Sequence, residues 1–92
     1  MAMVRITPVP VTVQWDARSG RPRRMRIGDD EVPVLDVRSV RDASRAYPAA
    51  RGPYVSFEVV TPRSRLILTY ERRLRRWLVE ALDPNGAVGR AA

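Results

Sequence analysis

Short segments that alternate apolar and polar residues recur along this chain, and this period-two pattern limits the fold more than any other feature. In the clearest segment, residues 9–16, Val9, Val11, Val13 and Trp15 alternate with polar residues or proline. Such alternation is typical of a β-strand with one buried face. The same pattern occurs at 23–27, 54–60 and 65–70, with turn-forming residues between the segments. The sequence therefore predicts a mainly β domain, either an antiparallel meander or a partly open barrel of about five to six strands.

The segment 31–41 breaks the simple alternation. Its apolar phase slips between Val34 and Leu35, directly after Pro33. A β-bulge in a long, bent strand produces such a slip, and the strand could then pair with one neighbour before the bulge and another after it. Residues 42–53 have no periodicity and end in Gly-Pro, so we expect them to form the longest loop.

Residues 71–82 allow two interpretations. Leu74, Trp77, Leu78, Ala81 and Leu82 have the spacing of an amphipathic helix, and periodicity alone favours a helix at 71–82. In the alternative, residues 72–75 are a hairpin loop and residues 77–82 a final strand, with Trp77, Val79 and Ala81 on one face.

The length of 92 residues predicts a single domain. We expect a flexible amino-terminal arm at 1–8, the β domain at 9–83 and a flexible tail at 84–92. The chain has no run of about 18 apolar residues and no apolar stretch typical of a secretory signal. A cytoplasmic location without membrane contact is therefore expected.

The chain contains no Cys, His or Lys. This composition excludes thiol nucleophiles, imidazole bases, Schiff-base lysines and Cys/His zinc sites. The consecutive acids Asp29, Asp30 and Glu31 are more typical of a solvated turn than of a weak cation site. We expect no catalytic activity, cofactor or metal.

All 17 basic residues are Arg, and they are unevenly distributed. The windows 18–26 and 72–76 contain nine Arg and no acid, whereas the rest of the chain has eight Arg and ten acids. The two windows therefore carry +9 and the remainder −2. In a simple meander, the connections at 17–22, 42–53 and 71–76 would share one end of the sheet, where both Arg clusters would converge. The nine residues are Arg18, Arg21, Arg23, Arg24, Arg26, Arg72, Arg73, Arg75 and Arg76.

Such a positive end is suited to a polyanion, and we expect these Arg residues to contact nucleic-acid phosphates without sequence readout. Solvated Arg residues that protect sheet edges and aid solubility are the alternative interpretation. Trp15 and Trp77 could stack on bases, but their place in apolar faces favours the core, and Tyr47 is the aromatic residue most expected to be exposed. Docking onto an acidic protein partner is the alternative function, and homodimerisation through an edge strand is a further option.

A set of short motifs resembles a family of uncharacterised small actinobacterial β-domains. The residues that carry this resemblance are Val11, Val13, Trp15, Asp16, Gly20, Arg21, Pro22, Tyr70, Trp77 and Val79. It covers most of residues 9–83 and implies a small all-β domain of unknown function. It also implies an association with error-prone DNA polymerase components, and hence with DNA repair or translesion synthesis. The chain departs from the family at 42–53, where Trp is usual, and at Leu74, where a turn Gly is usual. The resemblance favours a hairpin over a helix at 71–82.

Overall fold

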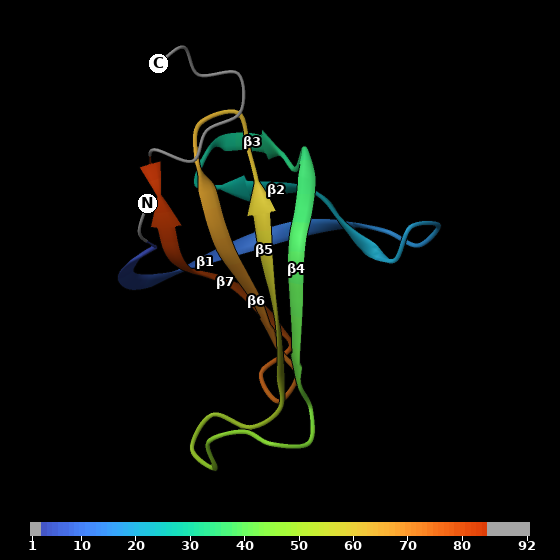
Figure 1. Cartoon of the computed structure of the whole chain (residues 1–92), viewed down its shortest axis with the longest axis vertical. Helices are drawn as coiled ribbons and strands as arrows, with labels where there is room; N and C mark the ends of the chain where they lie inside the picture. Colours follow the sequence, from blue (N-terminus) through green and yellow to red (C-terminus); the bar gives the residue numbers. More distant parts are fainter. Residues whose placement is uncertain (1–2, 85–92) are drawn as a thin grey trace.

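Seven antiparallel strands form the whole of the regular structure in the computed structural model, which describes residues 3–84 (Figure 1). The strands are β1 (Val4–Asp16), β2 (Arg21–Ile27), β3 (Asp30–Pro33), β4 (Asp36–Ala43), β5 (Tyr54–Val60), β6 (Arg65–Glu71) and β7 (Arg76–Asp83). Residues 3–84 contain no α-helix. The prediction of a mainly β domain is confirmed, with seven strands instead of five to six.

The strands form one sheet in the order β3-β2-β1-β7-β6-β5-β4. β1 joins the two halves of this sheet, because Val4–Val11 pair with β7 whereas Thr12–Asp16 pair with β2. The sheet curls into a half-barrel, with β2 and β3 folded across one face of the other strands (Figure 1). A simple meander is therefore wrong, because the first strand lies beside the last one.

The connection between β3 and β4 spans the two edges of the sheet. The N–H of Val34 donates to the carbonyl of Arg23 in β2 at 2.9 Å, and the N–H of Leu35 donates to the carbonyl of Val60 in β5 at 2.7 Å. The slip between Val34 and Leu35 thus marks a break between two strands and not a bulge within one. The expected change of neighbour is confirmed, since β3 pairs with β2 and β4 pairs with β5.

β1 begins at Val4, five residues before the predicted start at Val9. Residues 4–8, assigned above to a flexible arm, therefore belong to the sheet and pair with β7 near Leu82 and Ala81. The predicted tail at 84–92 lies, from residue 85 on, outside the described residues.

The core lies between β2 and the face of β5, β6 and β7 that is turned toward it. Its fully buried members are Met25, Phe57, Val59, Leu66, Leu68 and Val79. These residues alternate along their strands with polar or outward-facing residues, as the period-two pattern predicts. No helix in the described part of the chain is long and apolar enough to cross a bilayer.

Residues 71–82 form a β-hairpin, so the helix at 71–82 is wrong. β7 is a central strand, and both of its faces are covered: Trp77 and Leu82 pack against the core, whereas Leu78 is buried on the opposite face. Apolar residues on both faces of a strand reproduce helical spacing by coincidence. Leu74, the first residue of the helical pattern, is 58% exposed in the turn.

A register shift in the β6–β7 pair changes the face of one predicted core residue. Ile67 pairs with Ala81, and Leu68 pairs with Val79, so Glu80 is the extra residue of a bulge. Ala81 is therefore not on the face of Trp77 and Val79, as expected from simple alternation. It lines a cavity on the outer face of the sheet together with Ile67.

Candidate nucleic-acid interface

Four aromatic rings gather at one end of the core face. Trp15 lies with ring centroids 5.9 Å from Phe57 and 6.1 Å from Trp77, and Trp77 lies 5.8 Å from Phe57 and 5.0 Å from Tyr70. Centroid separations of this size are favourable for tilted and edge-on ring pairs. The rings form an open groove of about 250 Å³ that Val55 and Arg72 complete. We call it the aromatic groove.

The course of β1 places Trp15 in this groove. Val11 pairs with Trp77, after which β1 leaves β7 and pairs with β2. A register shift between Gln14 and Trp15 then lets the indole lie against Phe57 and Trp77. Trp15 is 46% exposed, so the expectation that both tryptophans are core residues is wrong for Trp15. The expectation that Tyr47 is exposed is confirmed, at 41%.

The first Arg cluster divides between two surroundings. Arg21 and Arg23 flank Pro22 on β2, and Pro22 pairs with Trp15, but neither arginine lines the aromatic groove. Arg24 and Arg26 instead face Glu31 of β3, at 3.6 Å and 3.4 Å. Exposed ion pairs of this kind contribute little stability, but they reduce the positive charge available to a ligand. Glu31 is therefore engaged by two arginines. Of the three consecutive acids predicted to form a turn, only Asp29 lies in it, because Asp30 and Glu31 belong to β3.

The second Arg cluster occupies the β6–β7 hairpin, and some of its side chains are likewise bound to other groups of the protein. Arg72 lines the aromatic groove. Arg73 donates from Nη1 to the carbonyl oxygen of Ala49 at 3.2 Å, and Arg76 donates from Nε to Glu71 at 2.7 Å. Arg75 adopts a positive φ of 52° in the tight turn, a backbone conformation that favours glycine. Arg72 is therefore the member of this cluster that lies in the groove.

The expected convergence of all three connections at one end of the sheet is wrong. The loop 44–53 does lie beside the β6–β7 hairpin, where the N–H of Arg72 donates to the carbonyl of Pro53 at 3.1 Å. The β1–β2 turn, however, projects to the side of the molecule, away from that end (Figure 1). β1 bends where its pairing changes from β7 to β2. The simple meander predicted from the sequence contains no such bend. Arg72 of the second cluster lines the aromatic groove, and Arg21 and Arg23 of the first cluster lie on β2, the strand that pairs with Trp15.

Asp16 organises the turn that carries Arg18. Its carboxylate accepts hydrogen bonds from the backbone N–H of Arg18 and the hydroxyl of Ser19, each at 3.0 Å. These two bonds hold the pKa of Asp16 below its ordinary value. Asp42 is held in the same way, chiefly by the Ser44 hydroxyl and backbone N–H, and its pKa is also lowered.

We expect the turn to weaken in acid. Because the pKa of Asp16 is lower in the folded state than in the unfolded state, its contribution to stability is present above about pH 4 and is lost as pH falls through the folded pKa. The difference in free energy of unfolding between the wild type and Asp16→Asn should therefore be constant near neutral pH and shrink below about pH 4. Urea denaturation at a series of pH values measures it. If the difference in free energy of unfolding instead grows in acid, the stabilising role assigned to ionised Asp16 is contradicted.

Sequence reasoning missed Arg51, which holds the loop 44–53 against the sheet. Its guanidinium donates to Glu71 at 3.1 Å and also to Glu80, and it lies 4.1 Å from the centroid of the Tyr54 ring. Gly52, with φ of +82°, allows the Arg73 side chain to approach its Cα closely. The loop has no periodicity, so the sequence pattern carries no signal for these contacts.

Comparison of the chain with protein-family models, with curated proteins and with solved structures gives no match.

Proposed function

We propose that this domain is a non-enzymatic module that binds single-stranded nucleic acid without sequence preference. The observation that carries the proposal is the exposed indole of Trp15 in an aromatic groove with Arg72 in its lining. Arg21 and Arg23 lie on β2, the strand that pairs with Trp15. A base would stack on Trp15 and Tyr70, while the arginines contact the adjoining phosphates. Proteins that bind single strands combine these two elements, and every base offers a π-face for stacking.

The geometry ranks the predicted Arg residues. Arg24, Arg26 and Arg76 are engaged by carboxylates, and Arg73 is bound to a carbonyl. Within residues 3–84, the remaining members of the two clusters have no ion-pair partner among the described carboxylates. These residues, proposed as the main phosphate contacts, are Arg18, Arg21, Arg23, Arg72 and Arg75.

A salt titration tests the proposal. We expect a labelled oligothymidine of about 12 nucleotides to bind at low salt, with log K falling by about 0.7 per phosphate contact for each unit of log salt concentration. Fluorescence anisotropy gives the affinity, and quenching of tryptophan emission reports stacking. Binding that is undetectable at low salt would contradict the proposal. If a duplex binds more tightly than the single strand and does not quench tryptophan emission, the domain contacts only the phosphate backbone.

The open edge of the half-barrel favours a second candidate function, docking of a protein partner. β4 is an edge strand, and Val40 within it and Leu35 just before it are exposed, at 58% and 50%. An added strand from a partner could pair there. The partner to test first is an acidic subunit of the error-prone DNA synthesis machinery, which the sequence resemblance suggests. A complex that persists at moderate salt after nuclease treatment, without affinity for free oligonucleotide, would favour this function, and light scattering would reveal a homodimer.

A further inference from the structure

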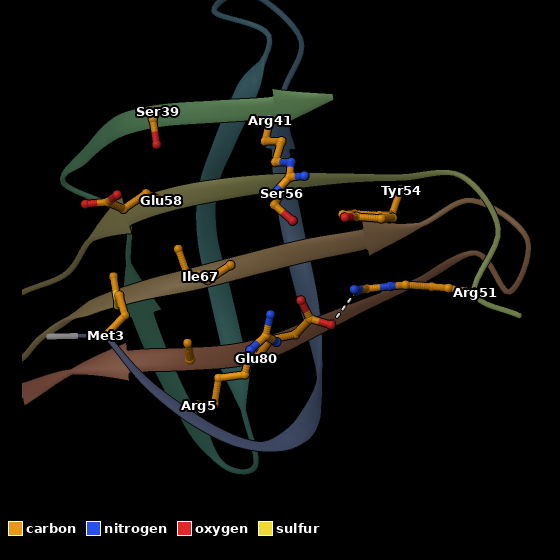
Figure 2. Close-up of a pocket in the computed structure, with 11 residues that line it drawn as sticks. Met3, Arg5, Ser39, Arg41, Arg51, Tyr54, Ser56, Glu58, Ile67 and Glu80 are labelled. Carbon is orange, nitrogen blue, oxygen red and sulfur yellow. Dashed lines mark hydrogen bonds and ion pairs between the residues drawn. The ribbon is translucent and has the colours of Figure 1, made fainter. Parts of the chain in front are cut away.

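A second cavity lies on the outer face of the sheet, opposite the core. It has a volume of about 390 Å³, and its floor consists of residues of β5, β6 and β7, including Ser56, Ile67 and Glu80 (Figure 2). Arg5 of β1 and Met3, which precedes that strand, line one side, and Ser39 and Arg41 of the edge strand β4 line the other. This volume is within the range of small-molecule sites, at its lower end. We call it the outer cavity.

The acidic side chains that line the outer cavity have ion-pair partners, whereas two of its arginines do not. Its two acids are already engaged: Glu80 by Arg51, and Glu58 by Arg65 at 3.4 Å. Arg5 and Arg41 have no carboxylate partner within residues 3–84. They come from opposite sides of the cavity, and Arg41 reaches over Ser56 (Figure 2). Two guanidinium groups are therefore free to bind an anion.

One wall of the outer cavity is held in place by contacts within the protein. Arg51 bonds to Glu71 and Glu80 and lies over the ring of Tyr54. Glu80 also accepts from the hydroxyl of Thr69 at 2.9 Å, and that hydroxyl lies 3.0 Å from the hydroxyl of Ser56. These bonds fix the floor and the Tyr54 wall before any ligand arrives, which lowers the entropic cost of binding.

We propose that the outer cavity binds a small organic anion through a phosphate or carboxylate group. Arg41 and Arg5 would hold the charged group, because a guanidinium pairs with either group through two parallel hydrogen bonds. The Ser39 hydroxyl is near enough to add a polar contact, and Ile67, Ala81 and Met3 offer apolar surface to the body of the ligand. This site lies on the face of the sheet opposite the aromatic groove and is independent of the proposed nucleic-acid function.

Titrations of the isotope-labelled full chain test this proposal, with inorganic phosphate, AMP and citrate as probes and uncharged adenosine as the control. We expect saturable shifts of the backbone amides of Ser39, Ser56 and Ala81 with at least one anion, and none with adenosine. Arg41→Met and Arg5→Met should each weaken the affinity by about tenfold. Arg63→Met, which removes an exposed arginine of the β5–β6 turn, should leave it unchanged. Both cavity arginines are exposed, so the variants are expected to fold.

Three results would overturn the proposal. The first is the absence of saturation with all three anions. The second is equal binding of adenosine and AMP, which would mean that charge is not recognised. The third is a shift of the Trp15 indole N–H in place of the cavity amides, which would place the anion in the aromatic groove. Because oligonucleotide binding is read at Trp15 and anion binding at the outer cavity, failure of one proposal is distinguishable from failure of the other.

Discussion

Replacement of Arg51 by methionine is expected to lower the free energy of unfolding by about 3 kcal/mol. Arg51 is the cation that neutralises Glu80 and one of two that neutralise Glu71, and these carboxylates are only 8% and 7% exposed. Removal of one partner from a buried ionic cluster leaves a charge without solvent or counter-ion, which costs more than the pair itself contributes. The side chain of Arg51 is itself partly exposed, so we place the loss at the lower end of the usual range.

Chemical denaturation of matched variants measures this effect. Arg63→Met changes the same residue type at an exposed site and should alter stability by less than about 0.5 kcal/mol. In the double variant Arg51→Met/Glu80→Gln, we expect more than half of the loss to be recovered, because a neutral amide at position 80 needs no counter-charge and can still accept from Thr69. If Arg51→Met were as stable as Arg63→Met, the ionic network around Arg51 would make no measurable contribution to the free energy of unfolding.

The strands could be predicted from the sequence because each has one face that must be apolar. Residues 54–60 alternate in this way, and the structure places Phe57 and Val59 in the core. The same rule fails for β7, which lies between β1 and β6 and has buried apolar residues on both faces. Its apolar residues then follow no single period, and local pattern alone could not separate strand from helix.

The relative placement of distant segments could not be predicted, since it depends on contacts between them. The bend of β1 follows from its pairing with β7 at one end and β2 at the other, which moves the β1–β2 turn away from the β6–β7 hairpin. The exposure of Trp15 has the same origin. Arg51 lies 20 residues from Glu71 and 29 from Glu80 in the sequence. The ionic network that these residues form can therefore be identified only from the folded structure.

Replacement of Trp15 by alanine is expected to weaken binding of single-stranded oligonucleotide by about tenfold, since one base-stacking contact is worth about 1–3 kcal/mol. The slope of log K against log salt concentration should not change, because the indole contacts no phosphate. Arg72→Gln is expected to do the opposite, lowering the slope by about 0.7 while Trp15 still stacks. The two variants therefore separate stacking from charge within the same groove.

Tyr47→Ala provides the matched control, because Tyr47 is an aromatic residue of similar exposure in the loop 44–53 and does not line the aromatic groove. Its affinity should stay within about twofold of the wild type. Trp15 also packs on Phe57 and Trp77, so thermal unfolding followed by circular dichroism must show that Trp15→Ala is folded at the temperature of the titration. A folded Trp15→Ala variant that binds as tightly as Tyr47→Ala would remove the groove from the interface and leave only the Arg residues as contacts.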